Sequence, residues 1–453
     1  MEKTDVLVIG GGPAAIIAAI TAKVNNPDKT VTLARKFEKV MVPCGIPYIF
    51  GTLNDVQKNV MGDAPMQAVD VKIVINEAVK IDLKGKKVSF ADGLEIEYEK
   101  LVIATGSATL KPNWLEGREK KGVYYVEKNI EYLTKLFEEL KKVNSVVVVG
   151  GGFIGVEMAE ELVKSGKRVT VVEKMPHVLM AAFDADISEQ AEKVLIERGV
   201  IIRSGVGIKK ITGGDKAEGV ELEDGSKIQA DAVILAMGYT PEVQLAKDAG
   251  IDTNQFGFIR ADEYMRTICC DNVFACGDCA EKRDFITRKV SRTMLASTAT
   301  TEARTAGMNL FKLSVEKSFG GTISIFDTKF GIFGFGVAGV TENNAKAERM
   351  DYVTGEFAGF DRHPGTLPDT GKQYVKLIAL KDTGTVIGGQ VCGAASAGEI
   401  TNLIGLAIQN KMNVYSLITS QIGTHPLLTS APTNYPLIKA AEAAMKKMKI
   451  GSK

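Results

Sequence analysis

The sequence predicts an α/β protein in which two doubly wound units follow one another and a third region completes the chain. The first observation is an internal repeat, because residues 5–15 (DVLVIGGGPAA) and 145–155 (SVVVVGGGFIG) are each a short apolar run followed by a glycine turn. The second is that each copy is followed by a similar strand that ends in glycine, at residues 101–106 (LVIATG) and 233–238 (VILAMG). Repeated units of this kind indicate two similar nucleotide-binding folds.

The composition is that of an ordinary globular chain. It has 453 residues, 45% hydrophobic and 25% charged, a length typical of roughly two to four domains. With 56 lysines and arginines against 55 aspartates and glutamates, the net charge is +1, which gives no reason to expect nucleic acid or a membrane as the main partner. The first apolar run ends at Gly10 and is too short for a signal peptide or a membrane span. We therefore expect a cytoplasmic protein, whose cysteines are thiols rather than structural disulfides.

The remaining segments are assigned from their periodicity. Residues 71–100 alternate short strands with turns and indicate a small β-meander. Residues 319–340 are rich in glycine, β-branched and aromatic residues, as expected for the opening strands of a third region. Helices are predicted at residues 127–142, 186–198, 397–411 and 433–448.

The first glycine turn, Gly10-x-Gly12-x-x-Ala15, directly follows a clean strand. Its glycines allow a tight turn and a close backbone approach, and the following helix points free N–H groups at a pyrophosphate, so this turn predicts a dinucleotide site. The second strand of this unit ends in Arg35 rather than in the acid that usually holds the ribose hydroxyls. Arg35 either stacks on adenine or pairs with a phosphate, or it is a solvated surface cation, and the sequence leaves both interpretations open.

The second glycine turn, Gly150-x-Gly152-x-x-Gly155, is the fuller dinucleotide fingerprint. Its second strand ends in Glu173, roughly 20 residues further on, where an acid accepts hydrogen bonds from the ribose hydroxyls. An anion at this place repels the 2′-phosphate of NADP, so this unit is expected to bind NADH. The alternative is an acid that is simply exposed at the end of a strand.

A third motif, residues 274–278 (FACGD), ends a strand in Gly-Asp. The carboxylate of Asp278 is placed where it can accept hydrogen bonds from the ribityl chain of a flavin. Gly-Asp is common in turns, so the motif gains its weight from following both glycine turns.

Cys44 lies just past the second strand of the first unit, in residues 43–48 (PCGIPY). Pro43 suits the first turn of a helix, so we expect Cys44 near a helix N-terminus, where free N–H groups and the helix dipole stabilise a thiolate. Such a sulfur is suited to nucleophilic or redox chemistry, and the alternative is a small buried cysteine that only packs. The position makes Cys44 the candidate catalytic residue.

The other cysteines are not expected to hold a metal. Cys269, Cys270, Cys276 and Cys279 form a C-C-x5-C-x2-C group, whose alternatives are a zinc site, an iron-sulfur site or a redox pair. However, Cys276 and Cys279 flank the Gly-Asp turn, and adjacent cysteines are poorly placed to ligate one metal together. Cys392 is expected to pack in the interior.

These motifs together resemble the pyridine nucleotide-disulfide oxidoreductases over essentially the whole chain. The resemblance implies FAD and NADH as cofactors and an α/β fold of two doubly wound dinucleotide-binding domains with a C-terminal α+β dimerisation domain, and hence a homodimer. It implies an FAD-binding domain from residues 1–112 and 241–318, an NAD-binding domain from 113–240 and a dimerisation domain from 319–453.

Only Cys44 matches the cysteines of this family, whereas members similar to glutathione reductase carry two, spaced C-x4-C. The chain therefore resembles the single-cysteine branch, which includes NADH oxidases, NADH peroxidases, coenzyme A-disulfide reductases and persulfide or polysulfide reductases. Residues 44–48 (CGIPY) are most similar to the Cys-Gly-x-Pro-Tyr of the coenzyme A-disulfide and persulfide reductases. The first glycine turn lacks the histidine found there in the oxidases and peroxidases.

The resemblance implies an NADH-dependent reductase of disulfide, persulfide or polysulfide sulfur that uses Cys44. The alternatives are an NADH oxidase that reduces oxygen and, in another class, a flavin-binding redox-sensing interaction protein. The acid that protonates the leaving thiolate is implied to be His425 or Tyr435, supplied by the partner subunit. The resemblance also places Glu157 near the nicotinamide and flavin, where the alternative is a surface acid on a helix. Further implied cofactor contacts are Pro13, Ala14, Val79, Thr105, Gly106, Phe153, Ile154, Gly238 and Ala296.

Overall fold

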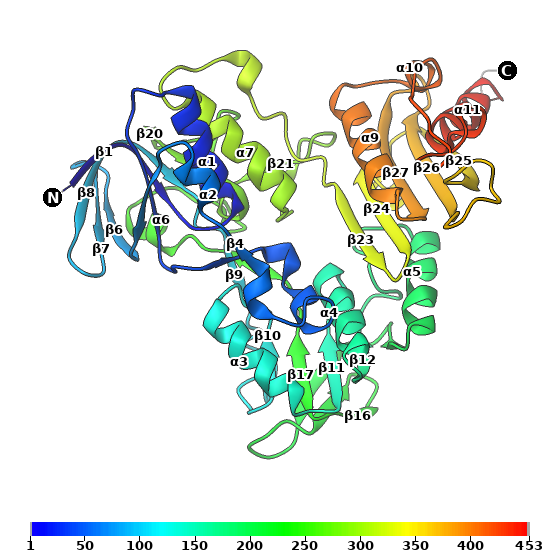
Figure 1. Cartoon of the computed structure of the whole chain (residues 1–453), viewed down its shortest axis with the longest axis horizontal. Helices are drawn as coiled ribbons and strands as arrows, with labels where there is room; N and C mark the ends of the chain where they lie inside the picture. The colour runs from blue at the N-terminus through cyan, green and yellow to red at the C-terminus, as the bar shows by residue number, and fades with distance from the viewer. Residues whose placement is uncertain (1, 451–453) are drawn as a thin grey trace. The chain divides into compact units, whose positions relative to one another are not determined.

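Buried apolar runs of the sequence form parallel strands in the structure, a computed structural model that describes residues 2–450 (Figure 1). The chain divides into two units, and each is assembled from segments far apart in the sequence. Unit 1 consists of Met1–Trp114, Tyr124–Val143 and Met237–Thr322, and unit 2 of Leu115–Val123, Asn144–Ala236 and Ile323–Lys453. Unit 2 thus combines the second nucleotide-binding fold with the C-terminal region. The predicted boundaries of the four domain segments stay a prediction.

Unit 1 contains a sheet with the strand order β19-β20-β8-β1-β2-β5, whose neighbours from β20 to β5 are all parallel. The central strand β1 (Glu2–Ile9) pairs with β2 (Val31–Arg35) on one side and β8 (Glu95–Ile103) on the other, and β5 (Lys72–Ile75) and β20 (Cys270–Ala275) extend the sheet. The apolar residues of β1 are buried, as a parallel strand between two covered faces requires.

Helices α1 (Pro13–Asn25) and α7 (Ala296–Asn309) pack closely against each other in unit 1. The face that α1 buries is made of alanines, and its small side chains allow this close approach. At Gly307 of α7, a Cβ atom would lie 2.7 Å from the Cβ of Thr21. The close packing brings the start of α7 into the same unit as the first glycine turn.

The predicted meander at residues 71–100 is correct for three strands and wrong for one. Strands β6 (Ala78–Asp82), β7 (Lys87–Phe90) and β8 pair in antiparallel order. Strand β5, however, pairs in parallel with β2 and belongs to the main sheet. The reason is the buried edge of β2, whose hydrogen-bonding groups are satisfied by β5.

The other elements of unit 1 are short, apart from helix α3, which was predicted. Strand β10 (Val123–Tyr125) spans the residues at which the chain passes from unit 2 into unit 1. They are β3 (Val40–Met41), η1 (Pro43–Gly45), η2 (Pro47–Phe50), η3 (Val56–Asn59), β4 (Val60–Met61), α2 (Ala64–Gln67), β9 (Ser107–Thr109), α3 (Ile130–Lys141), β18 (Tyr239–Pro241), α6 (Gln244–Asp248), β19 (Arg266–Thr267), η4 (Gly277–Cys279), β21 (Lys282–Arg283), β22 (Val290–Ser291) and η5 (Val315–Lys317).

Unit 2 repeats the parallel arrangement, and its strands β17, β11, β12 and β13 pair in parallel in that order within a five-stranded sheet. The central strand β11 (Ser145–Val149) leads through the second glycine turn into α4 (Phe153–Lys164). The remaining elements of this part are β12 (Arg168–Val172), α5 (Ala185–Glu197), β13 (Ile201–Arg203), the antiparallel strands β14 (Ile208–Thr212), β15 (Gly219–Leu222) and β16 (Lys227–Gln229), and β17 (Ala232–Leu235).

The C-terminal part of unit 2 is an antiparallel sheet with helices, which confirms the predicted third region (Figure 1). Its strand order is β23-β24-β27-β26-β25, with α9 packed against β24 and β27 and α11 packed against β25 and β26. The elements are β23 (Phe326–Phe330), β24 (Phe333–Gly339), α8 (Glu342–Ala347), β25 (Tyr352–Phe360), β26 (Lys372–Leu380), β27 (Val386–Gly393), α9 (Ala397–Gln409), α10 (Val414–Ile418), η6 (Pro432–Asn434) and α11 (Pro436–Ile450).

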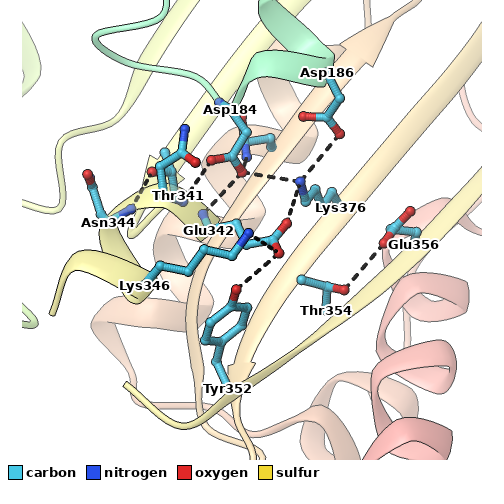
Figure 2. A network of polar contacts seen from close by, with 12 residues as sticks. Asp184, Asp186, Thr341, Glu342, Asn344, Lys346, Tyr352, Thr354, Glu356 and Lys376 are labelled. Carbon is cyan, nitrogen blue, oxygen red and sulfur yellow. Dashed lines mark hydrogen bonds and ion pairs between the residues drawn. The ribbon is translucent and has the colours of Figure 1, made fainter. Parts of the chain in front are cut away.

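A buried ion-pair network joins the nucleotide-binding part of unit 2 to this antiparallel sheet (Figure 2). The ammonium of Lys376, on β26, lies 3.2 Å from Asp184, 3.3 Å from Asp186 and 3.0 Å from Glu342. Its side chain is only 6% exposed. Burial acts against the charge of Lys376, but its acidic partners outweigh this effect and raise its pKa. The network therefore fixes the start of α5 against the sheet.

Candidate active site

The first glycine turn is shaped to accept a phosphate-bearing group. Gly10 has a φ of +138°, and a Cβ there would lie 2.1 Å from the carbonyl oxygen of Ala104, so only glycine fits. Gly12 caps α1, and a Cβ there would meet no atom within 4 Å. Pro13 follows at the first helical position, where its missing N–H costs nothing. The helix therefore begins at open space, as the pyrophosphate of FAD requires.

The Gly-Asp turn packs directly against this first glycine turn. Gly277 has a φ of +81°, and a Cβ there would lie 2.8 Å from the Cβ of Ala14. Residues that are far apart in the sequence thus meet at this point. Asp278 follows with its carboxylate partly exposed, and its Oδ2 accepts a hydrogen bond from Ser107 at 2.7 Å. These residues fit the diphosphate and the ribityl hydroxyls of FAD.

A lysine that the sequence analysis missed completes this cluster. The ammonium of Lys128 donates to Ser107 Oγ at 2.8 Å, lies 3.4 Å from Asp278 and is 4.6 Å from the ring centre of Tyr239. Burial raises the pKa of Tyr239, and the charges of Asp278 and Cys44 act in the same direction. Cys44 is therefore close enough to Tyr239 to act on it electrostatically. Ser107 directly follows the predicted contacts Thr105 and Gly106, and this adjacency was the one feature of the sequence that pointed to the cluster.

Cys44 is exposed and lies at the start of a short 3-10 helix, with Pro43 in the first turn as predicted. Its segment is the three-residue 3-10 turn η1, followed by the four-residue turn η2. Pro43 and Pro47 lack backbone N–H groups and interrupt regular hydrogen bonding, so a continuous α-helix does not form here. The helix is only three residues long, so its dipole is far smaller than that of a regular α-helix. The accessibility that a nucleophile needs is present.

Arg35 is not a solvated surface cation, so that interpretation is wrong. It is 4% exposed, and its two terminal nitrogens donate to the carboxylate of Asp63 at 2.6 and 2.8 Å. One of them also donates to the carbonyl of Glu38 at 2.6 Å. Asp63 occupies the end of the guanidinium that a phosphate would bind. Stacking on adenine stays a prediction.

The remaining predicted flavin contacts lie in unit 1, mostly where the backbone is irregular. Val79 is 52% exposed and falls where the β6–β7 pairing shifts register. Thr105 donates to the carbonyl of Glu242 at 2.5 Å, and Gly106 has a φ of +75°. Ala296 is the first residue of α7. Gly238, predicted as a cofactor contact, is also in unit 1, with a φ of +95° and open space around it.

The second glycine turn repeats the geometry of the first in unit 2. Gly150 has a φ of +108°, and a Cβ on Gly155 would lie 1.8 Å from the carbonyl oxygen of Gly150. Gly152 caps α4 with no atom within 4 Å of its Cβ position. The carboxylate of Glu173 accepts from the N–H of Gly151 at 2.6 Å and from that of Met175 at 2.7 Å. Glu173 is therefore held at the glycine turn, where it was predicted to meet a ribose.

Glu157 is not a surface acid. Its carboxylate accepts a hydrogen bond from the hydroxyl of Thr328 at 2.8 Å, and burial raises its pKa to about 7. On the same helix, Phe153 stacks on Phe326 with ring centres 4.9 Å apart and nearly parallel planes. Ile154, beside it, is partly buried. Strand β23 of the antiparallel sheet thus supports the helix that follows the second glycine turn.

The two candidate acids have opposite environments. His425 is exposed in the segment between α10 and η6, and its Nδ1 accepts a hydrogen bond from the N–H of Leu427 at 3.3 Å. Tyr435 is 6% exposed within its own chain, and burial raises its pKa. A tyrosine that exchanges protons near neutral pH needs a lowered pKa, which is the opposite of this shift.

None of the six cysteines forms a disulfide bond. The Sγ of Cys270 lies 2.9 Å from that of Cys269, while Cys276 and Cys279 are fully buried at the Gly-Asp turn. Cys392 is buried, as predicted, and its thiol donates to Gln190 at 3.2 Å. Within residues 2–450, no three histidine, cysteine or acidic side chains come together to form a metal site. No helix in the same range is both long and apolar enough to cross a membrane.

The fold and the two glycine turns define a flavin-dependent oxidoreductase that uses a pyridine nucleotide. The family model described as pyridine nucleotide-disulphide oxidoreductase matches residues 4–303, and the model of the dimerisation domain of the same enzymes matches residues 325–435. The chain therefore belongs to the pyridine nucleotide-disulphide oxidoreductase family, with FAD and NAD(H) as its cofactors.

Similar proteins carry names of two activities. An NADH oxidase of Methanocaldococcus jannaschii is 30% identical over 98% of this chain and 99% of its own length. A CoA-dependent NAD(P)H sulfur oxidoreductase of Pyrococcus abyssi is 30% identical over 97% of this chain and 98% of its own. The solved structure of an NAD-dependent persulfide reductase from A. fulgidus has a TM-score of 0.89 and 31% identity, covering 98% of this chain and 84% of that chain.

Proposed function

We propose that this protein is an NADH-dependent reductase of sulfur–sulfur bonds in coenzyme A disulfide, coenzyme A persulfide or polysulfide, and that Cys44 is its redox-active residue. The observation that carries the proposal is the exposed thiol of Cys44 in unit 1, the unit that also holds the first glycine turn and Asp278. The relatives named as CoA-dependent sulfur and persulfide reductases support this substrate class.

The flavin site is assigned to residues of unit 1. Gly10, Gly12 and the start of α1 bind the diphosphate of FAD, and Asp278 binds its ribityl hydroxyls, with Lys128 and Ser107 holding the carboxylate in place. FAD, when bound, supplies the two-electron chemistry that links a nicotinamide hydride to a sulfur acceptor. The chain positions the cofactor.

Cys44 performs the sulfur chemistry. Its thiolate attacks one sulfur of the substrate, so that a Cys44–sulfur bond forms, the substrate S–S bond breaks and a thiolate or hydrosulfide leaves. The leaving anion takes up a proton. Two electrons and a second proton then cleave the bond to Cys44 and release the second sulfur product. In sum, NADH, a proton and R–S–S–R′ give NAD⁺, RSH and R′SH.

The acid that protonates the leaving sulfur is assigned to His425 of a partner subunit in a homodimer. The dimerisation-domain match supports the dimer, and the exposure of His425 leaves its ring available to a second chain. Tyr435 is the weaker candidate because it is buried in its own chain and its pKa is raised.

The nicotinamide site is assigned to unit 2. Gly150, Gly152 and the start of α4 bind the diphosphate, and Glu173 binds the adenine ribose. The charge of Glu173 disfavours the 2′-phosphate of NADPH, so NADH is the preferred donor. Phe153 and Ile154 begin α4 and Glu157 follows one turn later, and their side chains are assigned to bind nearer to the nicotinamide.

An NADH oxidase is the second candidate, because relatives with that name cover almost the whole chain. Anaerobic NADH turnover with coenzyme A disulfide, coenzyme A persulfide, polysulfide or peroxide, compared with turnover in air alone, separates the two activities. The same assay with NADPH tests the donor preference. We expect a sulfur compound to give the highest kcat/KM. Turnover that needs only oxygen would contradict the proposal, and negligible turnover with every acceptor would point to a redox-sensing protein.

A further inference from the structure

A buried ion pair lies directly against the Gly-Asp turn of unit 1. Lys282 follows the turn in sequence, and Glu302 projects from α7. The side chains of both residues are almost fully buried, with exposures of 1% and 0%. Their charged atoms, Lys282 Nζ and Glu302 Oε1, are 3.7 Å apart. Neither residue belongs to a motif that the sequence analysis recognised.

Both side chains hold the backbone of Gly277. Glu302 Oε2 accepts a hydrogen bond from the N–H of Gly277 at 2.8 Å. Lys282 Nζ donates to the carbonyl of Gly277 at 3.0 Å and to that of Ala280 at 2.9 Å. Gly277 is in the left-handed region, with a φ of +81°. The pair thus fixes both polar groups of the residue that precedes Asp278.

Stability alone gives no reason for an ion pair here. Moving two charges out of water costs free energy, and well-packed apolar residues often serve the fold equally well. Burial raises the pKa of Glu302 to about 7, although Lys282 acts in the opposite direction. Glu302 Oε1 also has no hydrogen-bond partner. A costly, incompletely satisfied pair at this turn indicates a role in its geometry.

We propose that Lys282 and Glu302 are positioning residues for the flavin: they hold the Gly277 peptide so that Asp278 presents its carboxylate to the ribityl chain of FAD. The inference rests on the proposed role of Asp278. Each hydrogen bond to Gly277 orients the turn against Ala14 and the first glycine turn. Without them the turn can fold but samples other orientations, which weakens FAD binding.

The double variant Lys282→Met/Glu302→Met tests this role. It removes both charges together, so no unpaired charge is left buried and the apoprotein is expected to melt within about 3 °C of the wild type. The dissociation constant of FAD, measured by quenching of flavin fluorescence, is expected to rise about tenfold or more, which corresponds to one or more lost hydrogen bonds. The absorption band of bound FAD should shift. A wild-type dissociation constant with an unchanged spectrum overturns the proposal.

If the double variant fails to fold, two single variants test the same proposal. Glu302→Gln keeps an oxygen that accepts from the Gly277 N–H and should bind FAD with nearly wild-type affinity. Glu302→Leu lacks the oxygen and should bind FAD at least about tenfold more weakly. Equal affinities in these two variants overturn the proposal.

Two further variants show whether a negative result contradicts this inference alone or the proposed flavin site as a whole. Asp278→Ala should lose FAD affinity; if it does not, the proposed flavin site is itself wrong, and the inference falls with it. If Asp278→Ala weakens binding while the double variant does not, only the inference is wrong. Lys376→Met, in the buried network of unit 2, is the matched control: it should lower the melting temperature and leave FAD affinity unchanged.

Discussion

Cys44 stands in a proline-bounded 3-10 turn whose thiol is exposed, and its proposed chemistry depends on that single sulfur. We expect Cys44→Ser to keep FAD and to lose at least about a thousandfold in sulfur-acceptor turnover, because a hydroxyl is a far weaker nucleophile at neutral pH. NADH should still bleach the flavin absorbance of the variant anaerobically. The buried thiol Cys392 gives the matched control, since Cys392→Ser should leave turnover unchanged. Sulfur turnover at the wild-type rate in Cys44→Ser would exclude the mechanism.

Glu157 gives a second prediction, because burial raises its pKa from 4.5 to about 7. A carboxyl group with a raised folded-state pKa contributes stability that is fully present below about pH 4.5 and is lost as the pH rises through about 7. The glutamine of Glu157→Gln does not ionise, so the variant does not lose this stability as the pH rises. The melting temperature of the variant relative to the wild type should therefore be higher at pH 8 than at pH 5. The exposed helix acid Glu131 provides the control Glu131→Gln, and an equal difference at both pH values for Glu157→Gln would contradict the assignment.

Between elements, the Lys376 network of Figure 2 joins α5, α8 and β26 within unit 2. Removing one partner of a buried ion pair leaves the others uncompensated, so Lys376→Met should lower the free energy of unfolding by about 3–5 kcal/mol. Lys346 contacts the same acid, Glu342, at 3.1 Å, but its side chain is 62% exposed. Lys346→Met should therefore change stability little. Urea denaturation of both variants measures the contrast, and similar losses would refute the special role of Lys376.

At the scale of the whole molecule, the proposed acid belongs to the partner subunit. Cys44→Ser and His425→Ala should each be inactive with sulfur acceptors, but a mixture refolded together should recover activity. In a mixed dimer, one of the two sites combines a wild-type Cys44 with a wild-type His425 of the partner subunit. Random mixing therefore restores about a quarter of the wild-type turnover. No recovery in dimers shown to be mixed would mean that the acid is supplied within the same chain or by another residue.

The sequence predicted the features that depend on local backbone conformation. Gly10 and Gly150 are required because their φ angles, +138° and +108°, lie in a region that residues with a side chain rarely adopt. Such demands depend on a few consecutive residues, so both glycine turns, their strands and the helices that follow were predicted correctly. The place of Glu173 followed from its spacing to Gly150, and the structure holds it at that turn.

The tertiary structure decided which side chains meet. Arg35 appeared as a possible surface cation, yet it is buried against Asp63, 28 residues further along the chain. Lys128, Ser107 and Asp278 form one cluster, although Asp278 is 171 residues from Ser107 in the sequence. No local pattern marks such pairs, because an ion pair or hydrogen bond depends on distance in space. The sequence by itself determined the family, the fold class and the two dinucleotide turns, whereas only the packed chain determined how polar partners surround the proposed flavin site.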